Sequence, residues 1–437
     1  MVKPERVRAM PKALIISYFF PPLSGPGVQR SYNFVRHIAD SGWEPVVLTV
    51  KDICYVGRDE KLAANLVETE IIRTETLDPM RFLYLWEKFW GQSREESIYV
   101  RAGSEVRQFG RDIFPIDSKI GWLGFACKRA CKIIRTHNIK VIYATMSPYS
   151  AGILAYKVSK ATGIPYILDY RDLWQGKPDM SYFSKWHRML AENWEKRIIQ
   201  SARGIIQVTE WSRTRFLELN ADCDPEKVAV IFNGYDRNSI PGEISQVPEG
   251  GIIRFTYAGH FYGDRNPGEF LAALKELIAE EGLEEQVEFE FIGNYPREIE
   301  ELFFEHKCLK RIKYMNYSEY LEKLIDSSVL LLFISSRNSE MILTQKLFEY
   351  LAVRRPIFAM IPEAGEAAEI IRNYGAGLIT AGEDKAGIKR GIIEMIGIIR
   401  RGEVNNRFKV AENDYSKFER QAQARQLTEL MDKVTNG

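Results

Sequence analysis

The sequence alternates between two patterns of hydrophobic and polar positions. Short apolar runs rich in β-branched residues are typical of buried strands. They are followed by stretches in which apolar residues recur every three or four positions, which is typical of helices. Strands that alternate with helices in this way predict parallel sheets covered on both faces. The pattern therefore predicts an α/β fold.

Two series of such units follow one another along the 437 residues. The expected strands of the first series span 13–18, 45–50, 141–146, 166–170, 204–209 and 228–232. Those of the second series span 253–259, 287–293, 312–316, 329–335, 356–361 and 377–380. Between them, a stretch near 236–250 is rich in Gly, Pro and Asn and predicts a linker. We expect two Rossmann-like domains over residues 1–240 and 241–412, and one helix from Tyr415 to about Val434.

The composition of the chain limits which partners and which cellular compartment are expected. The net charge of +1 gives no overall field that would attract nucleic acid, so no nucleic-acid partner is expected. The 5 cysteines lack metal-ligand spacing, which favours reduced thiols and a cytoplasmic protein. No apolar run is long enough for a signal peptide or a membrane span. The sequence predicts a soluble or peripheral protein.

The first candidate site is the Pro/Gly loop after the strand 13–18, followed by a helix expected over about 28–41. Gly25 and Gly27 would let the backbone approach a phosphate at the helix N-terminus, and Arg30 in the first turn would add positive charge. The alternative is a tight strand–helix connection without a ligand. The segment lacks the third glycine of a dinucleotide-binding motif and the Gly-Lys-Ser/Thr of a phosphate loop, which disfavours NAD enzymes and nucleoside triphosphatases.

The second candidate follows the strand 166–170. Asp169 and Asp172 lie at its carboxyl end beside an arginine, where carboxylates stay ionised and can bind sugar hydroxyls or accept a proton. Alternatively, an Asp–Arg pair caps the loop. Trp174 would either stack on a sugar ring or cover the core.

The third candidate repeats the same arrangement after the strand 253–259. His260 would donate to a phosphate or pack within the loop, and Arg265, just before the next helix, would bridge two phosphate oxygens or remain a solvated surface residue.

The fourth candidate is the helix that begins at about residue 345. Thr344 is placed to cap it, Lys346 lies in its first turn, and both would favour a phosphate there. Glu349 shares a face with Lys346, and its carboxylate can accept both hydroxyls of a ribose. The alternative is an ordinary Lys–Glu pair on a helix surface.

An aromatic segment at 78–90 interrupts the first series. On an amphipathic helix, such residues would lie in a membrane interface or pack against protein. A second helix at 183–200 carries tryptophans and mixed charge and is expected to form a wall of the site rather than a lipid anchor.

Taken in order, these motifs resemble family 4 glycosyltransferases of the GT-B fold. The resemblance rests on FPPLSGPGVQR, LDYRDLW, IFNGYD, YAGHFYGDRNP, FIGN and TQKLFEYLAVRRPIFA, and it extends from about residue 13 to the last helix. It implies two Rossmann-like domains that face one another across a cleft, with acceptor binding in the first, donor binding in the second, and a C-terminal helix (413–437) that crosses back to the first.

The activity that the resemblance implies is a retaining transfer of a hexosyl or N-acetylhexosaminyl group from a nucleoside-diphosphate sugar, expected to be a UDP-sugar, without metal or other cofactor. The acceptor would be a glycan, lipid-linked or other glycoconjugate of cell-surface polysaccharide biosynthesis. The enzyme would then work in the cytoplasm or at the inner face of the cell membrane.

The resemblance also assigns residues to roles. His260 and Arg265 match the two cationic positions that hold the donor diphosphate, and Glu349 matches the glutamate that holds the ribose. The partner glutamate of the family falls on Met341, with Glu340 one residue away. A histidine that many members carry after the strand 141–146 is absent, which leaves its role to Tyr149, to Ser147 or to Asp172.

Together these assignments form the predicted site. The catalytic residues are Asp172, Arg265 and Lys346, the donor-binding residues are Gly25, Gly27, His260, Arg265, Thr344, Lys346 and Glu349, and the acceptor-binding residues are Arg30, Tyr149, Asp169 and Trp174. Two alternatives on the same fold stay open, a nucleotide-sugar epimerase and a catalytically inactive nucleotide-sugar-binding partner. The sequence does not identify the base, the sugar or the acceptor.

Overall fold

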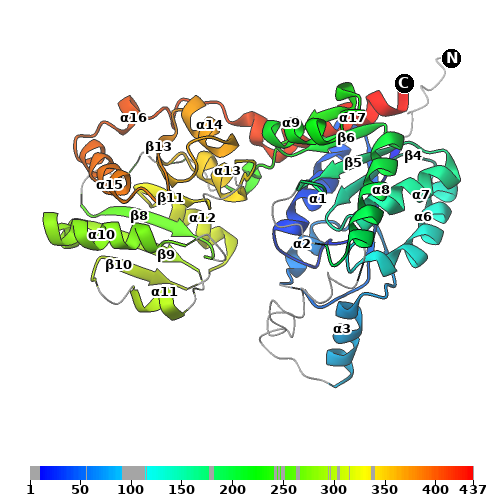
Figure 1. Ribbon diagram of the computed structural model, residues 1–437, viewed down its shortest axis with the longest axis horizontal. Helices are drawn as coiled ribbons and strands as arrows, with labels where there is room; N and C mark the ends of the chain where they lie inside the picture. Colours follow the sequence, from blue (N-terminus) through cyan, green and yellow to red (C-terminus); the bar gives the residue numbers. More distant parts are fainter. Residues whose placement is uncertain are drawn as a thin grey trace, which may run out of the picture. The chain divides into compact units, whose positions relative to one another are not determined.

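The chain folds into two compact units, each built on one parallel sheet (Figure 1). The computed structural model describes residues 10–436 except 56, 91–113, 115, 177–181, 241–243, 245–246, 248–250, 262–265, 294, 296, 303–305, 314 and 336–339. Unit 1 comprises Met1–Phe232 and Arg420–Gly437, and unit 2 comprises Asn233–Glu419. The predicted α/β class with two parallel sheets is confirmed.

Unit 1 contains a seven-stranded sheet in the order β3-β2-β1-β4-β5-β6-β7. Its strands are β1 (Lys12–Ile16), β2 (Glu44–Val50), β3 (Glu70–Thr74), β4 (Ile139–Met146), β5 (Tyr166–Tyr170), β6 (Gly204–Gln207) and β7 (Val228–Val230). Its helices are α1 (Pro26–His37), α2 (Glu60–Ala64), α3 (Pro79–Phe89), α6 (Leu123–His137), α7 (Ser150–Thr162), α8 (Lys185–Ser201), α9 (Glu210–Leu219) and α17 (Arg420–Asn436). The central strand β4 is buried at every position but Lys140, because helices cover both of its faces.

Unit 2 contains a six-stranded sheet in the order β10-β9-β8-β11-β12-β13. Its strands are β8 (Ile253–Ala258), β9 (Val287–Ile292), β10 (Leu309–Ile312), β11 (Val329–Phe333), β12 (Ile357–Met360) and β13 (Gly377–Thr380). Its helices are α10 (Gly268–Glu281), α11 (Arg297–Leu302), α12 (Tyr317–Ile325), α13 (Gln345–Ala352), α14 (Glu366–Asn373), α15 (Lys385–Arg400) and α16 (Val404–Arg407).

Both sheets reverse their strand order once, between β1 and β4 in unit 1 and between β8 and β11 in unit 2. At such a point the loops that leave the two neighbouring strands diverge to opposite faces of the sheet. The space outside the carboxyl ends of these strands is where open parallel sheets bind ligands. The loops after β1, β4, β8 and β11 are therefore the first places to look for a site.

Two strand predictions were wrong in detail. The edge strand β3 was missed, because its sequence EIIRT is short and half polar, as an edge strand allows. The strand expected at 312–316 lies earlier, at Leu309–Ile312, where it pairs with β9.

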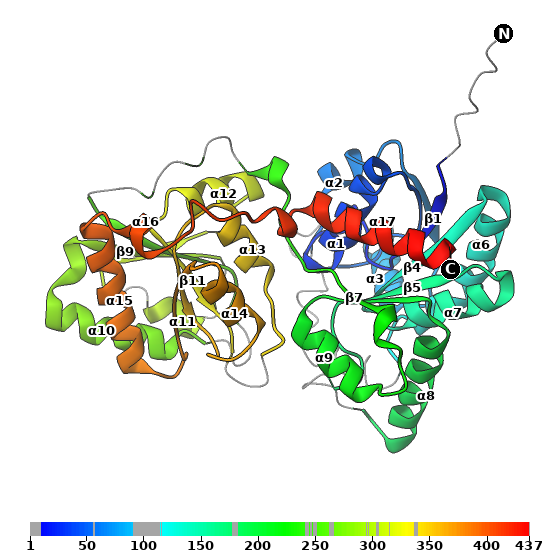
Figure 2. The same cartoon turned by 90° about the horizontal axis from the view of Figure 1, so that it is seen from above.

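The C-terminal helix α17 belongs to unit 1 and lies beside α1 (Figure 2). It begins at Arg420, later than the predicted Tyr415, because residues Ser416–Phe418 form a 3-10 turn and Glu419 is extended. The return of the last helix to the first unit agrees with the predicted architecture.

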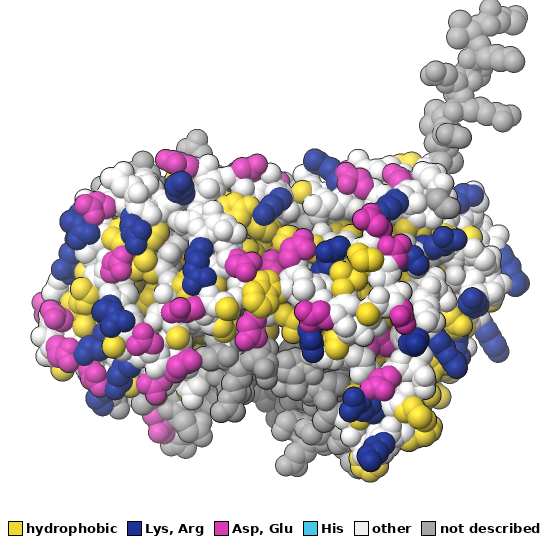
Figure 3. Space-filling view, turned by 45° about the horizontal axis from the view of Figure 1, so that its top comes forward, with side chains coloured by type: hydrophobic (Ala, Val, Ile, Leu, Met, Phe, Trp, Pro, Cys, Tyr) yellow, Lys and Arg dark blue, Asp and Glu magenta, His cyan; other side chains and the backbone are white. Residues whose placement is uncertain are grey.

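The surface carries charges of both signs. On the face shown in Figure 3, basic and acidic side chains are interspersed. Among the residues that the structure describes, no helix has the length and apolar character needed to cross a bilayer.

Candidate functional site

In unit 2, the end of β8 is shaped to admit one lysine. Gly259 follows β8 with a φ of +146°, a backbone conformation that L-residues rarely adopt. A Cβ at this position would collide with the Nζ of Lys346. Gly293, after β9, has a φ of +148° and packs on the carbonyl oxygen of Gly259 in the same way. Gly259 therefore leaves the room in which Lys346 lies, and Gly293 leaves room for the carbonyl of Gly259.

Lys346 stands in the first turn of α13, as predicted. Its Nζ donates to the Tyr257 hydroxyl at 3.3 Å and lies 4.7 Å from the centre of that ring. A cation over an aromatic face is attracted by the negative charge of the ring. Tyr257 thus fixes the ammonium group at the carboxyl end of the sheet, beside the point where the strand order reverses.

Glu349 lies one turn after Lys346 and is buried, with 7% of its surface exposed. Its Oε2 accepts a hydrogen bond from the Tyr320 hydroxyl at 2.7 Å, and its Oε1 accepts one from the Tyr317 hydroxyl at 3.2 Å. Glu349 is therefore not part of a solvated Lys–Glu pair on a helix surface. The two tyrosines of α12 hold the carboxylate of Glu349 in one orientation. Burial of Tyr320 and the charge of Glu349 raise the pKa of Tyr320 well above its usual value, so that the phenol stays a donor.

Thr344 occupies the N-cap position of α13, but the predicted side-chain cap is wrong. The hydroxyl makes no capping hydrogen bond, and its buried Oγ1 has no hydrogen-bond partner among the residues that the structure describes. The helix start is held instead through Gln345, whose Nε2 donates to the carbonyl of Gly234 at 2.5 Å.

The other predicted donor residues are placed less fully. His260 is exposed, and its carbonyl accepts from the Tyr257 hydroxyl at 3.3 Å. Arg265 lies outside the described residues. Glu340 and Met341 are both partly exposed, and the Glu340 carbonyl accepts from the amide of Glu366 at 2.9 Å.

A pocket of about 260 Å³ also opens at this edge of unit 2. It lies between the start of α10, with Glu269, and the ends of β11 and β12, and Glu383 lines it as well. Two carboxylates disfavour a phosphate group there. For a diphosphate the surroundings of Lys346 are therefore the better match.

In unit 1, the loop after β1 is closed by contacts within the protein. Gly25 has a φ of +116° and precedes α1, which begins with Pro26. The carbonyl of Gly27 accepts from Arg171 Nη1 at 2.6 Å, and a Cβ on Gly27 would come within 3.0 Å of the Tyr55 hydroxyl. The backbone conformation thus explains the glycine at position 25, and the close contact with Tyr55 explains the glycine at position 27. Phosphate binding by this loop stays a prediction.

Arg30 and Asp169 form a buried ion pair, with exposures of 1% and 0%. Arg30 Nε and Nη2 each lie 2.9 Å from an Asp169 oxygen, and Tyr143 also donates to this carboxylate. Arg30 further donates to the carbonyls of Ile231 and Phe232, at 3.0 and 2.9 Å, which are the last residues of unit 1 before the chain enters unit 2. These contacts give the pair a structural role. Contact with an acceptor stays a prediction for both residues.

Trp174 is wholly buried, so it occupies the core position that the sequence left open. Its ring stacks on Tyr149 with centroids 4.8 Å apart and planes 5° apart, and the Tyr149 hydroxyl donates to the carbonyl of Leu173 at 2.9 Å. Both side chains therefore support the loop after β5. Asp172, on the same loop, is exposed at the carboxyl end of the strand, where a catalytic carboxylate was expected.

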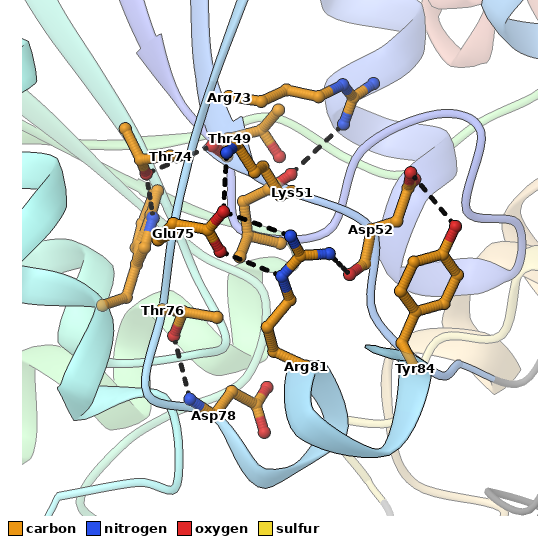
Figure 4. A network of polar contacts seen from close by, with 12 residues as sticks. Thr49, Lys51, Asp52, Arg73, Thr74, Glu75, Thr76, Asp78, Arg81 and Tyr84 are labelled. Carbon is orange, nitrogen blue, oxygen red and sulfur yellow. Dashed lines mark hydrogen bonds and ion pairs between the residues drawn. The ribbon is translucent and has the colours of Figure 1, made fainter. Parts of the chain in front are cut away.

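The aromatic segment forms helix α3, whose base is held by ion pairs (Figure 4). Arg81 pairs with both oxygens of Glu75, at 2.9 and 3.1 Å, and donates to the carbonyl of Asp52 at 2.8 Å. Asp78 caps the helix by accepting from the amide of Met80. Large apolar side chains remain exposed on α3, namely Phe82, Leu85, Trp86, Phe89 and Trp90. The structure thus presents a fixed aromatic face.

Sequence reasoning missed the tyrosines of α12. Tyr317 and Tyr320 stand three residues apart, which places them on one side of the helix, and this spacing is visible in the sequence. Their partner Glu349 is 32 and 29 residues away, so only the tertiary structure connects them.

Comparison with known families identifies the first half of the chain. Residues 25–234 match the model of the glycosyl transferase 4-like domain. This segment forms a glycosyl transferase 4-like domain. The resemblance drawn from the sequence motifs is confirmed. No curated protein sequence matched.

Solved structures extend the likeness of fold to the whole chain. Sucrose-phosphate synthase from Thermosynechococcus elongatus superposes with a TM-score of 0.61 at 13% identity, over 98% of this chain and 99% of that one. The lipopolysaccharide outer core galactosyltransferase WaaB superposes with a TM-score of 0.54 at 13% identity, over 96% of this chain and 100% of that one. A putative UDP-N-acetylglucosamine 2-epimerase from Listeria monocytogenes superposes with a TM-score of 0.57 at 9% identity, over 98% of this chain and 97% of that one. The glycosyltransferase-like domain thus belongs to a chain of GT-B architecture.

Proposed function

We propose that this protein is a retaining glycosyltransferase. It transfers a hexosyl or N-acetylhexosaminyl group from a nucleoside-diphosphate sugar, with a UDP-sugar as the first choice, to a hydroxyl of a glycan or lipid-linked acceptor. The observation that carries the proposal is the pair Lys346 and Glu349, one turn apart at the carboxyl edge of the second sheet. A fixed cation matches a diphosphate, and a buried, oriented carboxylate matches the hydroxyls of the attached ribose.

The proposed reaction breaks the bond between the anomeric carbon and the diphosphate oxygen, so negative charge grows on the leaving group. Lys346, the N-terminus of α13 and Arg265 would stabilise that charge. The acceptor oxygen bonds to the anomeric carbon on the face that the diphosphate leaves, and its proton passes to a leaving phosphate oxygen. The products are the glycoside and a nucleoside diphosphate. No metal ion enters the proposal, because these cationic groups supply the positive charge.

Asp172 is assigned to the acceptor side of the reaction. It is exposed on the loop after β5, at the carboxyl edge of the unit 1 sheet. A carboxylate there can accept hydrogen bonds from sugar hydroxyls and so orient the attacking oxygen.

The test is the release of nucleoside diphosphate from UDP-, GDP- and dTDP-sugars, with and without a glycolipid extract as acceptor. A transferase releases it only when donor and acceptor are both present. Lys346→Gln should lower kcat/KM by about 100-fold, as loss of a group that stabilises a leaving charge does. Lys310→Gln removes an exposed lysine on β10 and serves as the matched control. Full activity of Lys346→Gln would overturn the donor-site assignment.

A nucleotide-sugar epimerase is the second candidate, because an epimerase structure shares the fold over almost the whole chain. At 9% identity this likeness concerns the fold alone. An epimerase changes its substrate without any acceptor, so conversion of a UDP-sugar alone would favour it. A protein that binds nucleoside diphosphate, detected by a rise in Tm, and does neither reaction would be an inactive binding partner.

We further propose that α3 places the protein at a membrane surface when the acceptor is lipid-linked. Its exposed aromatic side chains suit the interfacial region of a bilayer, and Arg81 fixes the helix from which they project. Flotation with anionic liposomes tests this. The double variant Trp86→Ser/Phe89→Ser should lose flotation, whereas Phe183→Ser, which removes an exposed aromatic ring elsewhere, should keep it. Wild-type protein that stays wholly in the soluble fraction would refute membrane binding.

A further inference from the structure

A buried carboxyl group of α8 lies directly behind the loop that carries Asp172. Glu195 has 3% of its surface exposed. Its Oε1 accepts a hydrogen bond from the Tyr170 hydroxyl at 3.2 Å, and its Oε2 accepts one from the backbone amide of Gln175 at 3.2 Å. Each oxygen of one carboxylate thus holds a different residue.

The two partners mark the two ends of the loop. Tyr170 is the last residue of β5, and Gln175 follows five positions later. The residues between them include Asp172, which is exposed, and Trp174, which is wholly buried. One side chain from another helix therefore fixes where the loop leaves the strand and where it ends.

Two further contacts hold the middle of the loop. Arg171 donates to the carbonyl of Gly27 at 2.6 Å, and the Tyr149 hydroxyl donates to the carbonyl of Leu173 at 2.9 Å. These contacts flank Asp172 on either side in the sequence. The carboxylate of Asp172 consequently projects from a backbone that is held at several points.

We propose that Glu195 is a positioning residue for Asp172, and that its two oxygens, by accepting from both ends of the loop, set the conformation in which Asp172 orients the acceptor. This inference rests on the proposed function. The reason is geometric: the two oxygens of Glu195 accept hydrogen bonds from the two ends of the loop, so a side chain without acceptors leaves the Gln175 amide, which can only donate, without this partner. A glutamine keeps an acceptor for that amide, and its own N–H can donate to the Tyr170 hydroxyl, which accepts as well as donates.

The surroundings of Glu195 also change its affinity for a proton. Burial raises the pKa of Glu195 to about 7, and the hydrogen bonds from Tyr170 and Gln175 oppose that rise. Glu195 lines a pocket of about 770 Å³ between α8 and the segment after α9, which gives its proton a route to solvent. The titratable groups that face it or line this pocket are Tyr149, Tyr170, Tyr182, Arg188, Glu192, Lys196, Asp222, Cys223, Asp224 and Lys227.

The primary test is hydrogen exchange in the absence of substrates. Glu195→Leu keeps about the same size and removes both acceptors, so the Gln175 amide should exchange about tenfold faster than in the wild type, whereas Glu195→Gln keeps an acceptor and should exchange nearly as the wild type does. Glu192→Gln changes an exposed carboxylate on the same helix, paired with Arg188, and is the matched control. Unchanged exchange across residues 171–175 in Glu195→Leu would overturn the proposal, whether or not the protein proves to be a transferase.

The second readout separates positioning from general damage. With a UDP-sugar and glycolipid extract, Glu195→Leu should lower kcat by about 10- to 100-fold, as misplacement of a catalytic group does, and leave the KM for the UDP-sugar unchanged. Glu195→Gln, which can keep both hydrogen bonds, should recover most of that kcat. An equal loss of kcat in both variants would contradict the proposal. If the wild type shows no transfer at all, the proposed function fails, and the exchange result still decides the role of Glu195.

Discussion

At the scale of single residues, carboxylates are placed by tyrosines and amides rather than by opposite charges alone. Glu349 is held by Tyr317 and Tyr320, and Glu195 by Tyr170 and Gln175. Neutral donors orient a carboxylate without neutralising it, because each donates one directed hydrogen bond.

Of the two tyrosines that contact Glu349, Tyr320 should contribute more than Tyr317 to the binding of a nucleoside diphosphate. Tyr320→Phe leaves Oε2 of Glu349 without its short hydrogen bond and should weaken binding of a nucleoside diphosphate by about tenfold, with a loss of about 2 kcal/mol in the free energy of unfolding. Tyr317 is 47% exposed, so water can replace its hydroxyl, and Tyr317→Phe should bind nearly as the wild type does. Calorimetric titration with UDP, GDP and dTDP measures both variants. Equal affinity for the two variants would contradict this ranking.

Glu195 should also make the stability of the protein depend on pH. Its pKa is about 7 in the folded protein against an ordinary value of 4.5, so the folded state binds the proton more tightly than the unfolded state. The contribution of Glu195 to stability is therefore greatest at low pH, falls as the pH rises from about 4.5 to 7, and is constant above that.

A difference measurement isolates this effect from the other carboxyl groups. The free energy of unfolding of Glu195→Gln relative to wild type should rise by about 3 kcal/mol between pH 4.5 and pH 8. Urea titrations followed by tryptophan fluorescence suit the purpose, because all 8 tryptophans lie in unit 1, as does Glu195. A difference that is the same at both pH values would show that Glu195 has an ordinary pKa.

At the scale of elements, the ends of parallel strands decide which side chains reach the site. Gly259 and Gly293 follow neighbouring strands with positive φ values. The missing side chain of Gly259 leaves the space that Lys346 fills, and that of Gly293 leaves space for the Gly259 carbonyl. The Pro and Gly residues of the β1–α1 loop likewise admit Tyr55 and Arg171. A motif that resembles a phosphate-binding turn can thus be occupied by the protein itself.

Gly259→Ala should separate the role of this space from the cost of an unusual backbone. The new Cβ would displace Lys346, so binding of a nucleoside diphosphate should weaken by about tenfold or more, and the alanine should also destabilise unit 2 by about 1–2 kcal/mol. Gly282→Ala is the matched control, since Gly282 has a φ of +62° and open space around it. It should show the loss of stability and keep the affinity. Weakened binding in both variants would point to the backbone rather than to Lys346.

At the scale of the whole molecule, the chain completes unit 1 only with its last helix. Arg420–Gly437 belong to unit 1, although all of unit 2 precedes them in the sequence. The buried face of α17 includes Ala424, Leu427 and Met431, and the Trp43 indole donates to Asp432 at 3.0 Å. Unit 1 therefore includes residues that follow unit 2 in the sequence.

Leu427→Ala should test the contribution of α17 to unit 1. Removal of a wholly buried leucine side chain should lower the free energy of unfolding of unit 1 by about 2–5 kcal/mol. Glu429→Ala, two positions later on the exposed face, should change it by less than about 0.5 kcal/mol. Tryptophan fluorescence during urea unfolding measures unit 1 in both variants. Equal stability of the two variants would mean that α17 contributes little to the core of unit 1.

Much of the fold could be predicted because its causes are local. The runs that became β2, β4, β5, β8 and β11 are largely apolar, as strands buried on both faces require, and Gly259 follows β8 directly. The order of these elements was enough to predict two parallel sheets. β3 was not predicted, because an edge strand need not be continuously apolar.

The class of fold, the resemblance to glycosyltransferases and the positions of Lys346 and Glu349 on one face of a helix follow from the order of the residues, since periodicity and turn chemistry act over a few residues. The partners of each side chain depend on how distant elements pack. Arg30 meets Asp169 across 139 positions, Glu349 meets Tyr320 across 29, and Glu195 meets Gln175 across 20. Such contacts arise when packing brings separate elements together, and no local pattern encodes which carboxylate a given donor will reach.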